Sequence, residues 1–377
     1  MKIVCRNAAL EQFMEKVSCV LAGLIAALLL GIAVHGAVEP VHANNAEVYL
    51  RRADQEGFRR AASLSPQSSA PWIGLGLLAE NKDNVTEAEH DLIYAATLDR
   101  GYVPRWTLAN LYLRHADARA WPLLAEALRI AVHGGQDSAA LFEISWQFRS
   151  DSAFLLREVV GRSPETLRLY VRFLLDTHRT YALLEPSLLL AASAPGSEMA
   201  LLMQASDRLL SAGDGAGAER IWEKIFPPNH SGQLLTNTEF RTPSQLGFDW
   251  RYNSIPDSRI SFEGLARFDF TGRQPDPLEL LFQTALLTPG EYTFMWEAKQ
   301  ATARLQAGLF WQATDAKSGA ELFRHTLQAA DDWRSESEHF VLHTAALVRL
   351  SLHAERPPGH ARFEGTVWLR QPSLKIQ

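Results

Sequence analysis

One uncharged apolar segment constrains this chain more than any other feature. Residues 17–34 have the sequence VSCVLAGLIAALLLGIAV, which contains no charged side chain. With the four residues that follow, the segment reaches about the 20 residues that a helix needs to cross a bilayer. A backbone inside a bilayer must satisfy its own hydrogen bonds, which a helix does within one segment. We therefore predict a transmembrane helix over residues 17–38, preceded by a leader over residues 1–16.

The basic residues around this segment predict its orientation. Lys2, Arg6 and Lys16 precede it, and no lysine or arginine follows before Arg51. Because positive charge favours the cytoplasmic side, the N-terminus is expected in the cytoplasm. The rest of this single-pass membrane protein is then periplasmic or extracellular.

A cleaved signal peptide is the main alternative to a retained anchor. The small-residue pattern that ends at Ala43 is acceptable to a signal peptidase, although the apolar run exceeds the usual 7–15 residues or so. A third interpretation is a buried helix of a globular domain. Cys5 and Cys19 lie before or within the segment, so the remaining chain can form neither a disulfide nor a cysteine-ligated zinc site. A thiol-free body suits export and is also compatible with the cytosol.

Length and charge set two further limits. A chain of 377 residues is too long for one ordinary core and predicts two or three domains. A net charge of -6 with a pI near 6.1 argues against nucleic-acid binding, which usually requires a basic face. We expect no nucleic-acid partner.

Residues 45–226 have helical spacing with an internal recurrence. The motif Trp72-x2-Leu75-Gly76 is followed by Ala88-x3-Leu92-x2-Ala95, and a run of small and aromatic residues recurs 34 residues later. This spacing resembles that of tetratricopeptide repeats, in which two antiparallel helices form one unit. The resemblance implies that small residues lie where paired helices cross, while larger ones fill the space between pairs. The predicted packing residues are Trp72, Gly76, Ala88, Ala95, Trp106, Ala120, Ala127, Ala218 and Trp222.

The alternative for this region is a generic helical bundle in which the recurrence is chance. If the repeats stack, they form a concave groove that normally binds a partner protein. Five polar residues on or near the first helices of pairs are candidates to contact an acidic partner, or else are solvated surface groups: Arg105, Asn110, Arg114, Arg149 and Arg168.

After a linker at residues 227–233, alternation with period two replaces helical spacing. Apolar residues occupy every second position at 292–296, 348–352 and 367–369, and Gly-Pro turns separate such runs. About eight short strands over residues 234–377 predict an antiparallel β-sandwich of the jelly-roll type. The predicted fold class is thus multidomain α + β: a transmembrane helix, a helical repeat solenoid and a sandwich.

Three segments of this region resemble galactose-binding-like carbohydrate modules. They are an opening strand at 234–241 followed by Trp250, a Pro-Gly-x-Tyr strand at 287–294, and a closing strand at 365–374. The resemblance implies glycan binding and, in many members, a structural calcium. Arg241 and Arg370 stand where those members have acidic residues, and cations would repel Ca²⁺. We therefore expect neither a metal nor another cofactor.

Aromatic side chains are the candidates for stacking on sugar rings. Trp368 alternates with Val367 and Leu369, so it should point away from the core, beside Arg370. An indole next to a guanidinium suits a sugar acid, although the two groups could also stack on each other and bind nothing. The predicted ligand-binding residues are Trp368, Arg370 and Trp250. The other tryptophans considered, most of them expected in the core, are Trp296, Trp311 and Trp333.

No motif of a common enzyme class occurs. The chain has no phosphate-binding Gly-x-x-x-x-Gly-Lys loop, no Gly-x-Ser-x-Gly elbow and no His-Glu-x-x-His. Residues 331–338, with four carboxylates, are interpreted as a solvated turn. We predict a non-enzymatic envelope scaffold that binds a protein through its repeats and polysaccharide through its sandwich, as an accessory to polysaccharide assembly or export. The alternatives are a purely protein-binding scaffold and a glycan hydrolase.

Overall fold

The computed structural model describes residues 45–227, 232–301, 308–328, 331–356, 358–359 and 364–377. The chain folds into two compact units, with the division between Val159 and Val160. The predicted leader and transmembrane helix, residues 1–38, lie outside the described residues. Within the part of the chain that is described, no helix has the length and apolar character needed to cross a membrane.

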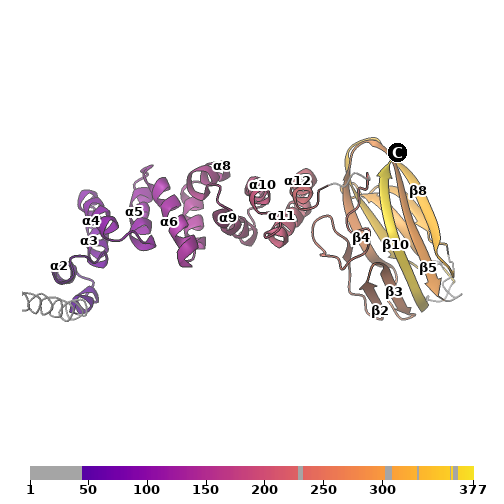
Figure 1. Cartoon of the computed structure of the whole chain (residues 1–377), viewed down its shortest axis with the longest axis horizontal. Helices are drawn as coiled ribbons and strands as arrows, with labels where there is room; N and C mark the ends of the chain where they lie inside the picture. The colour runs from indigo at the N-terminus through magenta and orange to yellow at the C-terminus, as the bar shows by residue number, and fades with distance from the viewer. Residues whose placement is uncertain (1–44, 228–231, 302–307, 329–330, 357, 360–363) are drawn as a thin grey trace, which may run out of the picture. The chain divides into compact units, whose positions relative to one another are not determined.

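The first unit consists of short helices, and from α2 to α6 each helix packs against the next one (Figure 1). Side-chain caps explain where several begin: Asp54 accepts a hydrogen bond from the Gly57 amide, and Asn84 accepts one from the Glu87 amide. The helices are α2 (Gln55–Leu64), α3 (Ala70–Glu80), α4 (Val85–Leu98), α5 (Tyr102–Arg114), α6 (Ala120–Gly134), α7 (Ala139–Phe148), α8 (Ser152–Leu155) and the π-helix η1 (Leu156–Val160).

Small residues allow the close crossing of α3 and α4. A Cβ atom at Gly76 would lie 2.7 Å from Cγ of Leu92, a separation that only glycine avoids. Four of the predicted packing alanines have no exposed surface: Ala88, Ala95, Ala120 and Ala127. The structure thus has helical pairs with tight crossings. The assignment of these pairs to tetratricopeptide repeats stays a prediction.

The two predicted packing tryptophans of this unit are half-buried. Trp72 meets Tyr94 of α4 edge-on, with 4.7 Å between ring centroids. Trp106 stacks on Tyr102, one turn earlier in α5, with 5.9 Å between centroids. Both rings therefore contact an aromatic partner of their own helical pair.

The second unit begins with four more helices and a 3₁₀ turn. Ala218 is fully buried, as expected for a packing residue. Trp222, expected between helical pairs, instead packs against Phe248 of the following domain, with 5.9 Å between ring centroids. The helices are α9 (Pro164–Asp176), η2 (Thr180–Ala182), α10 (Leu184–Ser193), α11 (Met199–Ser211) and α12 (Gly215–Ile225).

The rest of the second unit is a sandwich of two five-stranded sheets (Figure 1). One sheet has the order β1-β4-β9-β6-β7 and the other β2-β3-β10-β5-β8, with antiparallel pairing throughout. The strands are β1 (Arg251–Tyr252), β2 (Ser258–Phe262), β3 (Ala266–Thr271), β4 (Leu278–Leu287), β5 (Gly290–Ala301), β6 (Leu309–Asp315), β7 (Glu321–Thr326), β8 (Arg334–Leu342), β9 (Ala346–Ala354) and β10 (Glu364–Ile376).

The order of the strands follows the jelly-roll pattern. From β3 to β6 each successive strand changes sheet, β6 and β7 form a hairpin, and from β7 to β10 the chain alternates again. Alternation along the strands buries one side of each sheet. On β5, for example, Tyr292, Phe294 and Trp296 are almost fully buried between the sheets.

The opening strand expected at residues 234–241 does not exist. Residues 232–250 form no strand, because their polar side chains hold them in turns. Asn237 hydrogen-bonds the Arg241 backbone in both directions, at 2.8 Å each way. The Gln283 amide donates to the Phe248 carbonyl at 2.8 Å and anchors this segment to β4. The sandwich proper therefore starts at Arg251.

Candidate functional site

The outer face of the sheet β2-β3-β10-β5-β8 carries the predicted ligand residue Trp368. Its neighbours Val367 and Leu369 are 2% and 0% exposed, so their side chains enter the core. Trp368 is only half-buried and lies on the opposite face of β10. The sheet register places Arg267 of β3 on one side of Trp368 and Lys299 of β5 on the other.

A second half-buried tryptophan lies on the same face. Trp333 directly precedes β8, and the guanidinium of Arg370 lies 4.1 Å from the centroid of its ring. Arg370 also pairs with Glu297 of β5, with 2.5 Å between Nε and Oε2. Arg370 is therefore held by Trp333 and Glu297 and does not stack on Trp368.

The polar groups around Trp368 differ in whether they are already paired. The Arg267 guanidinium lies 5.9 Å from the Trp368 ring centroid and 3.0 Å from the Asp269 carboxylate. The Thr366 hydroxyl donates to the same carboxylate at 2.6 Å. Lys299, in contrast, makes no hydrogen bond or ion pair with any described residue. Lys299 is therefore a cation beside Trp368 that is available to a ligand. The two residues are far apart in the sequence, and the sheet register brings them together.

Trp250, predicted to bind ligand, is a core residue. It is 0% exposed, and its indole N–H donates to the Asn237 carbonyl at 3.2 Å. Its ring packs against Phe240 and Trp311 between the sheets. Trp296 is likewise almost fully buried. Of the five tryptophans considered, the structure brings only Trp368 and Trp333 to the outer face.

The segment interpreted as a solvated turn is largely strand β8. Glu336 points inward with its side chain 4% exposed, and an oxygen of it lies 3.0 Å from Nε2 of His325. Glu338 approaches Nδ1 of the same ring at 2.7 Å. The histidine belongs to β7 and the carboxylates to β8, so this cluster ties together the edges of the two sheets. Among the residues that the structure describes, no group of histidine, cysteine and acidic side chains is arranged to hold a metal.

The five residues proposed for the repeat groove are engaged within the chain. Arg114 makes two 2.6 Å hydrogen bonds to Glu80, and Arg105 pairs with Glu126 at 2.7 Å. The others contact their own surroundings: Arg168 pairs with Glu198 at 3.2 Å, Arg149 covers the Phe154 ring at 4.0 Å, and Asn110 donates to the Trp106 carbonyl at 2.8 Å. These contacts stabilise the helices. None of the five residues is therefore singled out as a contact for the predicted protein partner.

The fold defines the class of the chain as α + β: helical pairs followed by an antiparallel β-sandwich.

No family model matches the sequence, and no curated protein matches it. Among solved structures, a CBM4 carbohydrate-binding module is 15% identical, covering 38% of this chain and 99% of that one, with a TM-score of 0.29. The module TmCBM61 in complex with β-1,4-galactotriose is 13% identical, with coverages of 38% and 99% and a TM-score of 0.27. The α-L-arabinofuranosidase MgGH51 is 12% identical, with coverages of 38% and 26% and a TM-score of 0.30. Likeness at this level assigns no family and no ligand.

Proposed function

We propose that this protein is a non-enzymatic binding protein whose sandwich holds a glycan on its outer face. One observation carries the proposal: the half-buried Trp368 and Trp333 both lie on the face of the sheet opposite the core. A tryptophan with one ring face packed and the other accessible offers an apolar platform of fixed orientation. The C–H faces of pyranose rings are suited to such a platform.

The polar groups on this face supply the second element of sugar recognition. Hydroxyl groups of a ring stacked on Trp368 would meet the Thr366–Asp269–Arg267 network at its edge. Because these groups already hydrogen-bond each other, they are held in place before a ligand arrives. Lys299 provides a positive charge beside the same ring, which favours a glycan that carries carboxylate groups. Arg370 packs against the Trp333 ring and has a positioning role.

Affinity electrophoresis of the full-length chain through gels containing neutral or acidic polysaccharides tests this function. We expect retardation by an acidic polysaccharide, and loss of that retardation in Trp368→Ala and in Trp333→Ala. Val341→Ala is the matched control, because Val341 is a 50% exposed apolar residue on β8. Lys299→Gln should weaken retention by acidic but not by neutral polysaccharide.

Three results would count against a non-enzymatic glycan site on this face. Retardation that persists in both tryptophan variants would place the glycan elsewhere on the chain. No retardation by any polysaccharide, with both variants still folded, would favour the alternative in which the sandwich contacts only protein. Release of reducing sugar during the assay would instead favour the hydrolase alternative.

We further propose that the chain displays this sandwich outside the cytoplasm from an anchor at residues 17–38. The uncharged segment and the basic residues before it support this topology. Protease added to intact spheroplasts should degrade the chain after residue 38. The protected N-terminal fragment should resist carbonate extraction from the membrane. A soluble mature form that starts near Asn44 would show that the segment is a cleaved signal peptide.

A further inference from the structure

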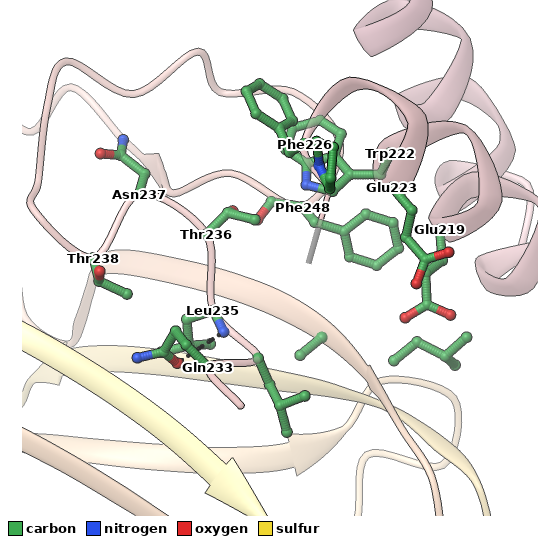
Figure 2. Close-up of a pocket in the computed structure, with 14 residues that line it drawn as sticks. Glu219, Trp222, Glu223, Phe226, Gln233, Leu235, Thr236, Asn237, Thr238 and Phe248 are labelled. Atoms are coloured by element: carbon green, nitrogen blue, oxygen red, sulfur yellow. Dashed lines mark hydrogen bonds between the residues drawn. The ribbon is translucent and has the colours of Figure 1, made fainter. Parts of the chain in front are cut away.

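A cavity of about 300 Å³ lies between helix α12 and the start of the sandwich, within the second unit (Figure 2). Helix α12 forms one wall, and the other walls come from the turn-rich segment after it and from β4. Its volume is near the lower limit of the pockets that bind small ligands, about 300–1,000 Å³. The cavity thus has room for one side chain or a small molecule.

The walls of this cavity are mainly apolar. Trp222 forms an aromatic cluster with Phe226 and Phe248, with centroid distances of 4.8 Å and 5.9 Å. Leu235 and Leu286 line the space further along. Such walls favour an aliphatic group of the ligand, because burying apolar surface releases it from water.

Two carboxylates at one end of the cavity give it a negative charge. Glu219 and Glu223, one turn apart on α12, both project from the helix into the space beside β4 (Figure 2). Neither makes a hydrogen bond or an ion pair with any described residue. Burial raises the pKa of Glu219, and the neighbouring charge of Glu223 raises it further. Arg220 and Lys224 belong to the same helix but are exposed and do not line the cavity. A cation from outside would therefore relieve an uncompensated charge pair.

One buried donor in the wall also has no partner. Trp222 is 5% exposed, and its indole N–H makes no hydrogen bond within the described structure. A buried N–H without an acceptor is unfavourable, and a ligand with a carbonyl or hydroxyl oxygen could accept its hydrogen bond. The ligand that fits best thus combines an ammonium group, an aliphatic stem and an acceptor oxygen.

We propose that this cavity binds a lysine residue of a partner protein. The ammonium group pairs with Glu219 and Glu223, the four-carbon stem lies along the Trp222 side, and a backbone carbonyl of the partner accepts from the indole N–H. A free alkylamine satisfies only the first two of these requirements. The cavity is separate from the outer face of the sheet, so this inference does not rest on glycan binding.

Titration of the full-length chain with N-acetyl-lysine methylamide, followed through the indole N–H resonance of Trp222, tests the proposal. Trp222→Phe assigns the resonance. We expect saturable binding in the millimolar range, and no binding of the norleucine analogue, which has the same stem without the ammonium group. Glu219→Gln should weaken binding about tenfold, as expected for the loss of a charge-assisted contact. Glu185→Gln, an exposed carboxylate on α10 outside the cavity, should leave it unchanged.

Each comparison also has an outcome that overturns the proposal. Equal binding of the lysine and norleucine compounds would show that the carboxylates do not recognise a cation. Unchanged affinity in Glu219→Gln and Glu223→Gln, with unaltered melting temperatures, would do the same. If n-pentylamine binds as tightly as the lysine derivative, the site recognises free amines, and a lysine of a partner protein is the wrong ligand.

Discussion

The guanidinium of Arg370 lies over the ring of Trp333, 4.1 Å from its centroid. The two residues are 37 positions apart in the sequence. From the sequence, Arg370 could stack on Trp368, its neighbour on β10, whereas the structure places it on Trp333. Glu297 completes the arrangement by pairing with the same guanidinium at 2.5 Å. Arg370 thereby fixes the ring of Trp333 against the sheet.

Replacement of Arg370 tests whether this residue only positions Trp333 or also contacts the glycan. Arg370→Ala removes a partly exposed ion pair and a cation–π contact, each worth up to about 1 kcal/mol, so we expect a loss of about 1 kcal/mol in the free energy of unfolding. Glycan retention should fall only partly, because Trp368 stays in place. Denaturant unfolding together with affinity electrophoresis measures both effects. A complete loss of retention at unchanged stability would mean that Arg370 contacts the ligand directly.

Trp250 and Trp368 should respond in opposite ways to truncation. Trp250 is fully buried, and Trp250→Ala should cost roughly 3–5 kcal/mol, the usual range for an aromatic ring lost from a core. Trp368→Ala should leave the melting temperature nearly intact and abolish glycan retention. Thermal unfolding of the two variants makes the comparison. If Trp368→Ala unfolds the sandwich, Trp368 is a packing residue and the outer-face site is wrong.

The crossing of α3 and α4 makes Gly76 intolerant of the smallest side chain. Alanine usually favours a helix over glycine by about 1 kcal/mol, yet a Cβ here would lie 2.7 Å from Leu92. We therefore expect Gly76→Ala to destabilise the first unit despite its better helix propensity. Gly196→Ala is the control, since a Cβ at Gly196 meets no atom within 4 Å and should be neutral or slightly stabilising. Equal melting temperatures for the two variants would show that the helices separate easily.

His353 should make the sandwich less stable in mild acid. Burial lowers the pKa of His353, and the nearby Arg349 and Arg324 lower it further against the opposing charge of Glu279. The unfolded chain takes up the proton near pH 6.5, while the folded chain does so only at lower pH. Stability from this residue is thus complete above about pH 6.5 and is lost as the pH falls through the folded pKa.

Unfolding free energies at pH 7.5 and pH 5 measure this contribution. His353→Gln should reduce the difference between the two values, because the substituted side chain does not titrate. The same substitution at the exposed His339 should leave the difference in place. A pH dependence that is identical in wild type and His353→Gln would assign the effect to other groups.

The sequence predicts the sandwich well where side chains alternate between core and solvent. Trp368 is flanked by two apolar residues that enter the core, so period two alone places it on the outer face. Trp250 has no such pattern around it, because the adjoining strand β1 is only two residues long. Its burial depends on the turns that Asn237 forms, and these become visible only when the hydrogen-bond partners are known.

The same limit applies to pairing across the sheet. Lys299 lies opposite Trp368 because the register of β5 and β10 brings them together. The sequence contains no marker of that register, since most outer positions of both strands carry polar side chains. The small residues at the crossings predict the helical pairs. They do not predict the contact between Trp222 and Phe248, because this contact joins a helix to the segment that precedes the sandwich.

The attachment of the last helices to the sandwich limits how this protein can evolve by exchange of domains. Asp207 of α11 accepts hydrogen bonds from the Gly247 amide and from the Arg251 guanidinium, at the point where the first strand begins. A recombination within residues 227–233 would separate these partners and leave Trp222 and Phe248 uncovered on the two fragments. An exchange of the sandwich that keeps these contacts therefore has to carry α11 and α12 with it.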